Sequence, residues 1–183
     1  MSILSANLGK NVGHKAPGRR SAREWALQLM FSIDANPPPS EDLCETIADF
    51  WEQQILISSD KGEISSENLN AIAPKSLRTF TEALVKGAWE NRDAIDAKIT
   101  GYLANWSIPR MGAVDRNVLR LAFYEMFWRD ETPPVVIINE AVDIAKFFST
   151  RDSGKFVNGI LDKASKDCNR PIRGKQSTEP QEK

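Results

Sequence analysis

Apolar residues recur at helical spacing near the start of the chain. Between residues 21 and 33 they fall on one stripe, three or four positions apart, as follows: Ala22, Trp25, Ala26, Leu29, Met30 and Ile33. This spacing predicts an amphipathic helix. Ser21 followed by Glu24 has the pattern of a capping box, so we expect the helix to begin at Ser21. Three prolines at residues 37–39 end it.

The middle of the chain predicts two further helical segments with a polar stretch between them. A helix that starts at Ser40 carries its apolar face on Leu43, Ile47, Phe50 and Trp51. Residues 58–73 are polar and poorly periodic, which predicts mainly a loop with one short helix. The helical stripe returns over residues 74–103, where Gly87 and Gly101 weaken it and predict a kink.

The C-terminal part of the chain predicts three helices. Residues 112–129 are apolar on two sides, which is typical of a helix at the centre of a fold. Thr132 is expected to cap the next helix, which runs to Ser149, and Ser153 is expected to cap the last one. After Asn169 the composition becomes polar, and we expect a disordered end.

These patterns together predict the fold class. No segment alternates apolar and polar residues over a useful length, so we expect an all-α fold of about six or seven helices. A chain of 183 residues suits one compact domain. We expect a flexible basic arm over residues 1–18, the helical domain over residues 19–168 and a disordered tail over residues 169–183.

Composition argues against an enzyme. The single histidine, His14, removes the catalytic dyads and two-histidine zinc motifs that need this residue, unless His14 itself folds into a site. The sequence contains neither a Gly-x-Gly-x-x-Gly motif nor a Gly-Lys-Ser/Thr loop. We therefore expect no catalytic residue, no cofactor and no metal ion.

Hydropathy and cysteine usage predict a cytoplasmic protein. The longest apolar runs contain four residues, whereas a membrane-spanning helix needs about twenty. The chain does not begin with the basic and apolar pattern of a secretory signal. Cys44 and Cys168 lack partners at metal-binding spacing, so we expect them to be reduced thiols.

Charge is distributed unevenly along the chain. Residues 1–23 contain five basic residues and no acid, whereas residues 34–74 contain nine acids and one base. A basic arm on a near-neutral body suits a polyanionic partner. The plainer interpretation is that the arm keeps the chain soluble, and charge alone does not separate the two.

Two segments have the chemistry of an anion site. An arginine cluster at residues 19–23 leads into the first helix, and guanidinium groups pair with phosphate oxygens and stack on bases. Residues 149–156 form a loop and a helix start, where free backbone N–H groups and Lys155 favour an anion. Phe156 can stack on a base, but its place on the apolar stripe favours a core role on spacing alone.

Other polar residues in the helices have a structural interpretation. Glu125 and Arg129 are four positions apart, which predicts an exposed ion pair. Asn139, Glu140 and Lys146 fall in a helix with a strong core face, where we expect structural polar contacts. None of these residues carries a functional prediction by itself.

Three blocks in the C-terminal half carry a family resemblance. Their order and spacing closely resemble the NusB family of bacterial transcription antitermination factors; the blocks are VDRNVLRLAFYEM at residues 114–126, INEAVDIAK at 138–146 and KFVNGILDK at 155–163. The arginine cluster followed by Glu24, Gln28 and Leu29 is similar to the N-terminus of the family. The resemblance covers about residues 19–165, while residues 34–76 match poorly and look longer than usual.

The resemblance implies an all-helical RNA-binding protein. Members of this family pair with NusE, a protein of the small ribosomal subunit, and the pair holds a single-stranded boxA element in nascent ribosomal RNA. The complex joins RNA polymerase with other Nus factors and suppresses termination. By this resemblance, the RNA contacts fall on Arg19, Arg20, Arg23, Phe31, Asp152, Lys155 and Phe156.

Two departures from the family pattern affect these assignments. Phe31 stands where the family often has tyrosine, so the hydroxyl group is lost. Tyr102 and Asp115 match the NusE-binding surface, but the loop between them differs in length by about one residue. Some family members self-associate through the surface that RNA would use, so the resemblance leaves a homodimer open.

A second class of function stands beside the RNA-binding factor. It is a NusB-like helical module that binds proteins without sequence-specific RNA binding, such as the domain that accompanies some RNA methyltransferases. Such a module normally comes with a cofactor-binding α/β domain, and we expect none here. A titration with a boxA-like RNA and a scrambled RNA separates the two classes.

Overall fold

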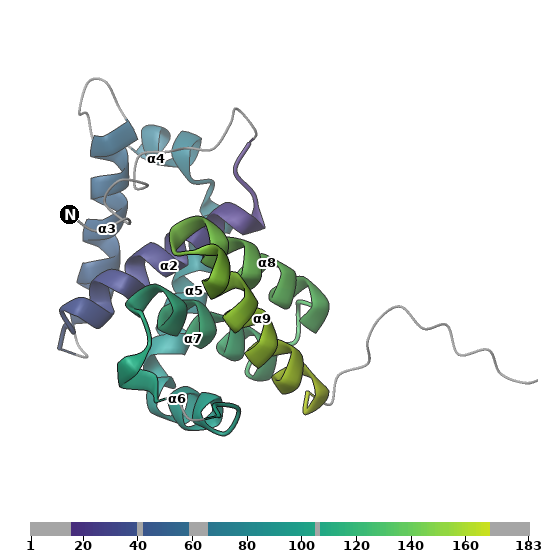
Figure 1. The fold of residues 1–183 in the computed structure, drawn as a ribbon. Helices are drawn as coiled ribbons and strands as arrows, with labels where there is room; N and C mark the ends of the chain where they lie inside the picture. Colours follow the sequence, from purple (N-terminus) through teal and green to yellow (C-terminus); the bar gives the residue numbers. More distant parts are fainter. Residues whose placement is uncertain (1–15, 40–41, 59–65, 105–106, 169–183) are drawn as a thin grey trace, which may run out of the picture.

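The computed structural model describes residues 16–39, 42–58, 66–104 and 107–168 (Figure 1). These residues form eight α-helices and one 3-10 turn: α2 (Arg19–Ala35), α3 (Leu43–Ser58), α4 (Ser66–Ile72), α5 (Lys75–Glu90), α6 (Arg92–Thr100), η2 (Ile108–Arg110), α7 (Ala113–Phe127), α8 (Pro134–Phe148) and α9 (Arg151–Lys166). No strand occurs in the described ranges, and the predicted all-α class is confirmed. The predicted cap Ser40, the predicted tail and most of the predicted arm lie outside them.

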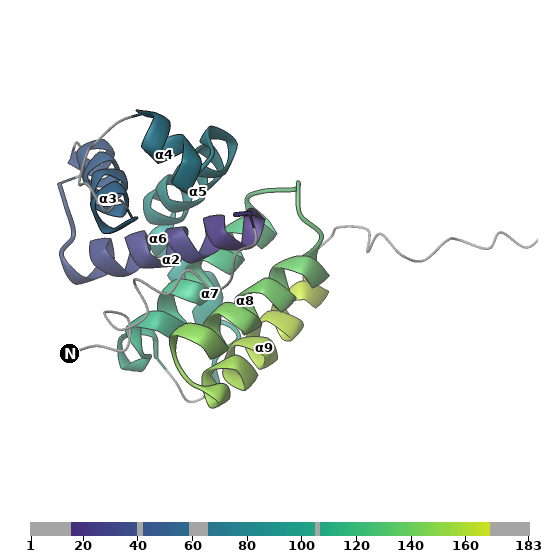
Figure 2. The ribbon, with the colours of Figure 1, turned by 90° about the horizontal axis from the view of Figure 1, so that it is seen from above.

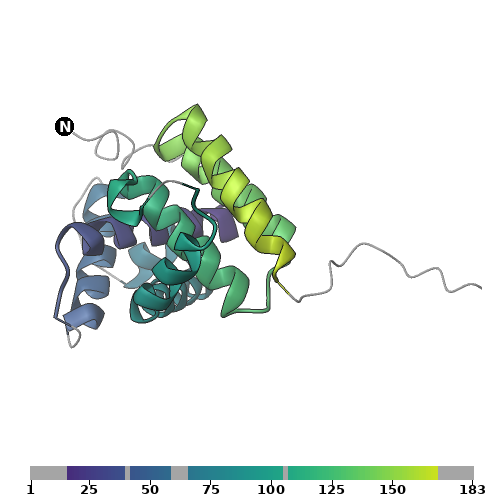
Figure 3. The same ribbon diagram turned by 60° about the horizontal axis from the view of Figure 1, so that its bottom comes forward.

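Helix α2 lies between two groups of helices. Seen from above, α3, α4 and α5 lie on one side of α2, and α7, α8 and α9 lie on the other (Figure 2). Helices α8 and α9 form an antiparallel pair that packs against α7 (Figure 3). The stripe predicted for residues 21–33 faces inward, since its members Ala22, Ala26, Leu29, Met30 and Ile33 are fully buried or nearly so.

Helix α7 is the centre of the fold, as its two apolar sides predict. It packs against α2, α5, α6, α8 and α9. Its core residues are Val118, Leu119, Leu121, Ala122, Phe123 and Met126, all of which are buried. A helix that contacts neighbours on every side can position several of them at once. Helix α7 contacts both α2 and α9 in this way.

The long stripe over residues 74–103 is two helices that meet at Asn91. The side-chain amide of Asn91 donates to the carbonyl of Gly87 at 2.8 Å and helps to end α5. The predicted kink at Gly87 is therefore misplaced. Gly87 continues the helix, and a Cβ at this position would collide with the ring of Tyr124. This split raises the number of described helices above the six or seven expected.

A buried ion pair ties α2 to α7. The Arg23 guanidinium donates to both oxygens of the Glu125 carboxylate, at 2.9 and 2.5 Å. The Thr132 hydroxyl donates to the same carboxylate at 2.8 Å. Two expectations are therefore wrong: Thr132 does not cap α8, and Glu125 is not an exposed partner of Arg129, which pairs with Glu131 instead.

A second network joins α2, α6 and α7. Asp34, near the end of α2, accepts hydrogen bonds from Arg116 and Arg120 of α7. Arg120 also donates to both carboxylate oxygens of Asp96 in α6, at 2.8 and 2.7 Å. Burial opposes the charged form of Asp34, but the hydrogen bonds from the two arginines outweigh it and lower the pKa of Asp34. The C-terminal end of α2 is thus anchored to the first turns of α7.

Two further features concern the described residues only. None of their helices is both long enough and apolar enough to span a membrane. No group of three or more histidine, cysteine, aspartate or glutamate side chains lies where it could hold a metal ion within those same ranges. Both cysteines are free thiols, with Cys44 exposed and Cys168 partly buried.

Candidate nucleic-acid interface

The first turn of α2 presents two exposed arginines. The backbone N–H of Gly18 donates to the Ser21 hydroxyl at 3.4 Å, and the helix begins at Arg19, so the predicted start at Ser21 is two residues late. Arg19 and Arg20 are exposed, and this turn contains no acidic residue. Because a helix N-terminus already carries partial positive charge, the two guanidinium groups concentrate positive potential there.

The two guanidinium groups have different neighbours. Arg19 lies over the ring of Phe80 in α5, 4.2 Å from the ring centroid. Arg20 donates from Nε to Glu24 and from a terminal nitrogen to Asp143 of α8, each at 3.1 Å. Burial lowers the pKa of Arg20, but the bonds to Glu24 and Asp143 outweigh it and raise that pKa overall. Arg20 therefore links the start of α2 to α8.

Arg23 lies one turn further along α2 and is buried. Only 8% of the residue is exposed, and its guanidinium is bound to both oxygens of Glu125. Removing one partner of a buried ion pair costs about 3–5 kcal/mol, so a phosphate group would have to overcome a comparable penalty to reach Arg23. The structure therefore gives Arg23 a structural role in the ion pair with Glu125, and its predicted RNA contact stays a prediction.

The start of α9 brings a cation and an aromatic ring together. Thr150 is the N-cap, since its hydroxyl oxygen accepts from the Ser153 N–H at 3.1 Å; the predicted cap Ser153 lies inside the first turn. Asp152 and Lys155 are exposed and pair at 3.1 Å. Phe156 is partly buried and packs against the core, so it contributes to packing while part of it stays at the surface.

Asp115 joins the start of α7 to the start of α9. Its carboxylate accepts a hydrogen bond from the Ser153 hydroxyl at 3.1 Å. Burial raises the pKa of Asp115 more than hydrogen bonds from Ser153 and Ser149 lower it. A carboxylate held in this way fixes the two helix starts relative to each other.

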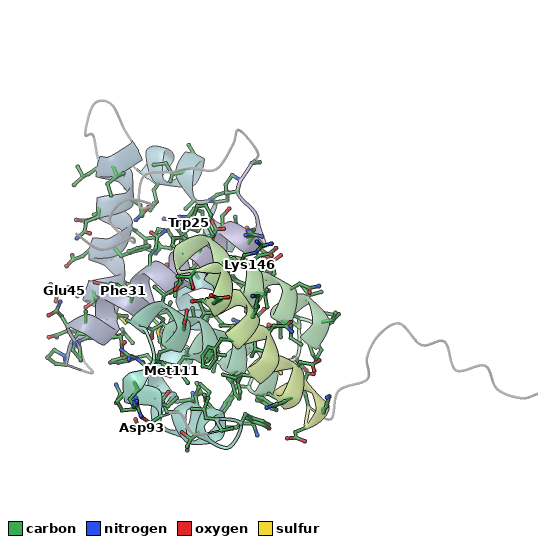
Figure 4. All side chains as sticks on the ribbon, in the orientation of Figure 1. Trp25, Phe31, Glu45, Asp93, Met111 and Lys146 are labelled. Atoms are coloured by element: carbon green, nitrogen blue, oxygen red, sulfur yellow. The ribbon has the colours of Figure 1, made fainter. Side chains whose placement is uncertain are left out.

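Contacts through α8 connect the starts of α2 and α9. Asp143, which bonds to Arg20, also pairs with Lys146 one turn later on α8, at 3.7 Å. The Lys146 side chain lies against Gly154 in the first turn of α9. Figure 4 shows Lys146 beside the first turns of α2 and Phe31 toward the other end of that helix.

Phe31 lies eleven residues after Arg20 on α2, which is about three turns of helix, so the two residues point to the same side of α2. Phe31 also lies one turn before Asp34, which bonds to Arg116. The residue before Arg116 is Asp115, which bonds to Ser153 at the start of α9. We give the candidate residues of these three helices the name α2–α8–α9 face; they are Arg19, Arg20, Phe31, Asp143, Lys146, Asp152, Lys155 and Phe156.

Tyr102 lies elsewhere, at the opposite end of α9. Its hydroxyl donates to Asp167, just beyond that helix, at 2.7 Å. Burial and the bond to Asp167 raise the pKa of Tyr102 to about 12. Since a helix rises about 1.5 Å per residue, Asp167 is about 20 Å from Ser153. The structure therefore does not bring Tyr102 and Asp115 into one patch.

Sequence reasoning missed two members of the face, Asp143 and Lys146. The sequence predicts only structural contacts for Lys146 and no role for Asp143. Their spacing of three residues places them on one side of a helix and is a usable signal. The contact that matters joins Asp143 to Arg20, which lies 123 positions earlier, and no local pattern reveals it.

Comparison with known sequences points to one family. A model of the NusB family matches residues 20–166. A transcription antitermination protein NusB of Syntrophus aciditrophicus is 38% identical over 79% of this chain and 77% of its own length. The protein of the same name from Geobacter sulfurreducens is 40% identical over 79% of this chain and 91% of its own.

Solved structures agree with the sequence comparison. A NusB structure from T. maritima is similar with a TM-score of 0.64 and 33% identity, and the match covers 84% of this chain and 94% of that one. A structure of the antitermination factors NusB and NusE in complex with double-stranded RNA matches with a TM-score of 0.64 and 26% identity, over 81% and 96% of the two chains. The family match and these relatives show that the chain belongs to the NusB family.

Proposed function

We propose that this protein is an RNA-binding transcription antitermination factor of the cytoplasm. It binds a boxA-type single-stranded element in nascent ribosomal RNA together with NusE, and the complex helps RNA polymerase resist termination with other Nus factors. The names of its relatives support this proposal, as does the similar structure of NusB and NusE with RNA. The observation that carries it is the α2–α8–α9 face, where two helix starts carry exposed cations and α2 and α9 each carry a partly exposed aromatic ring.

The chemistry of the face suits a single strand of RNA. Arg19, Arg20 and Lys155 supply the positive charge that neutralises phosphate groups. Phe156 and Phe31 supply rings on which unpaired bases stack, at about 1–3 kcal/mol per base. Helix starts add backbone N–H groups that point toward an anion. Such binding involves no covalent step, and we propose that the protein acts without catalysis.

The contact with NusE is proposed from the family resemblance. Tyr102 and Asp115 are its candidate residues, and they lie near opposite ends of α9. A partner that touches both must therefore extend along the length of this helix. A smaller partner contacts one end only, and alanine substitution at each position tells the two arrangements apart.

A binding titration tests the proposed function. The full chain is titrated with a boxA-like single-stranded RNA, a scrambled RNA of equal length and a duplex of the boxA-like strand, each with and without NusE. We expect preference for the boxA-like strand and tighter binding with NusE present. Equal affinity for all three RNAs, with or without NusE, would overturn the proposal in favour of a protein-interaction module.

A further inference from the structure

An acidic side chain, Asp143, contacts two cations of the α2–α8–α9 face. Asp143 accepts from Arg20 of α2 at 3.1 Å with one carboxylate oxygen. Its other oxygen lies 3.7 Å from the Lys146 ammonium. One carboxylate thus bridges cations from two helices, which is the arrangement a phosphate group adopts between an arginine and a lysine.

The surroundings of Arg20 reinforce this arrangement. Glu24 holds the Nε atom of the same guanidinium at 3.1 Å, and Glu140 on α8 adds a further electrostatic attraction. Arg20 is therefore surrounded by acids of the chain itself, from α2 and from α8. In the unbound protein, acids of the chain itself therefore compensate part of the positive charge of Arg20.

We propose that Asp143 is an internal competitor for RNA phosphate on the α2–α8–α9 face. This inference rests on the proposed function. A phosphate that reaches Arg20 either displaces Asp143 or settles beside a carboxylate of like charge, and both outcomes weaken binding. Asp143 thereby lowers the affinity of the face for RNA. RNA whose bases also stack on the aromatic rings is then favoured over RNA that contacts the face through phosphate groups alone.

The geometry makes a purely structural role of Asp143 a poor explanation. About half of the Asp143 side chain is exposed, as is a similar share of Arg20 and Lys146. Exposed ion pairs contribute little to stability, so removal of the charge leaves the fold intact. Asparagine matches aspartate in shape, and Asp143→Asn removes the charge with little change in packing.

The test measures affinity for the boxA-like single strand at low salt with wild type, Asp143→Asn and a matched control. Asp162→Asn is the control, because Asp162 is an exposed aspartate that pairs with Lys166 at 3.7 Å near the far end of α9. Both substitutions change the net charge equally. We expect Asp143→Asn to raise the affinity about threefold and Asp162→Asn to change it much less, with melting temperatures unchanged.

A double substitution sharpens the result. In an Arg20→Ala background, Asp143→Asn loses most of its effect, because the arginine for which Asp143 competes is absent and only the longer contact with Lys146 remains. An affinity gain no larger than that of Asp162→Asn overturns the inference. A lower affinity of Asp143→Asn also overturns it, because Asp143 would then orient Arg20 for RNA.

The same titrations separate this inference from the proposed function. Wild type that prefers the boxA-like strand, with no specific gain in Asp143→Asn, contradicts only the role of Asp143. Wild type that shows no preference among the RNAs contradicts the proposed function, and the inference fails with it.

Discussion

The five arginines of α2 and α7 fall into two sets that differ in burial. Arg23, Arg116 and Arg120 are buried or largely buried, and each is paired with an acid of another helix. Arg19 and Arg20 are exposed in the first turn of α2. Arg23 of the buried set stands close in the sequence to Arg19 and Arg20 of the exposed set. Residue type and position in the sequence therefore do not separate the two sets. On the proposed function, burial separates the arginines that join helices from the arginines that contact RNA.

The buried set prepares the surface on which the exposed set lies. Arg23 fixes the first half of α2 to α7 through Glu125, and Asp34 fixes its end through Arg116 and Arg120. Buried ion pairs contribute little net stability, but breaking one is costly because a charge is left uncompensated. Helix α2 therefore has a defined position, and Arg19 and Arg20 project from a fixed helix start.

The largest expected effect belongs to the buried set. Arg23→Ala leaves the Glu125 carboxylate without its ionic partner, and the free energy of unfolding should fall by about 3–5 kcal/mol. Urea unfolding measures this loss, with Arg19→Ala as the exposed control. RNA affinity of the folded Arg23→Ala protein should change little. Stability near that of wild type together with lost RNA affinity would show that Arg23 belongs with the exposed set.

Phe156 is partly buried, so its substitution should affect both stability and RNA binding. Phe156→Ala should weaken the binding of boxA-like RNA by about 1–3 kcal/mol, roughly 5- to 150-fold, through loss of stacking. Its stability loss should stay below the roughly 3–5 kcal/mol of a fully buried phenylalanine, because Phe156 is only partly buried. Phe156→Tyr should retain binding. A large drop in melting temperature with normal RNA binding would assign Phe156 to the core alone.

Acid titration compares two anchoring carboxylates with opposite pKa shifts. The folded pKa of Asp34 lies below its ordinary 3.8, so the unfolded chain takes up this proton first and stability falls as pH drops through that range. Burial raises the folded pKa of Asp115 above 3.8, so its protonation favours the folded chain. As the pH is lowered, the free energy of unfolding should therefore fall less in Asp34→Asn than in wild type. It should fall more steeply in Asp115→Asn than in wild type. The reverse order would contradict the assigned surroundings.

The smallest effect concerns single exposed cations. Lys155→Ala should leave stability within about 0.5 kcal/mol of wild type. The slope of log affinity against log salt should flatten by about 0.7, the value for one phosphate contact with a single strand. Lys163→Ala, which removes an exposed lysine further along α9, is the matched control. Equal slopes for the two variants would remove Lys155 from the RNA-binding face.

The periodic apolar pattern predicts most of this fold because it records burial directly. Helix α7 is apolar on two sides and proves to be central, and the class is all-α as expected. Helix starts were less predictable. Ser21 and Ser153 both lie in a first turn rather than at a cap, and a serine at either place gives the same local sequence signal.

The candidate site was predictable only where its chemistry is local. The Lys155–Phe156 pair and the arginine cluster are visible as residue types in a short segment. The burial of Arg23 depends on Glu125, 102 positions away, and the role of Asp143 depends on Arg20, 123 positions away. Pairings between distant elements come from tertiary packing, which no single segment encodes.

The salt dependence of boxA-like RNA affinity shows whether the exposed arginines bind RNA while the buried ones hold the fold. Three contacts, from Arg19, Arg20 and Lys155, predict a slope of about −2 for wild type. Arg19→Ala combined with Arg20→Ala should flatten it by about 1.4 with little change in stability, whereas Arg23→Ala should lower stability and keep the slope. An Arg23→Ala protein that flattens the slope, beside a double variant that does not, would contradict this account.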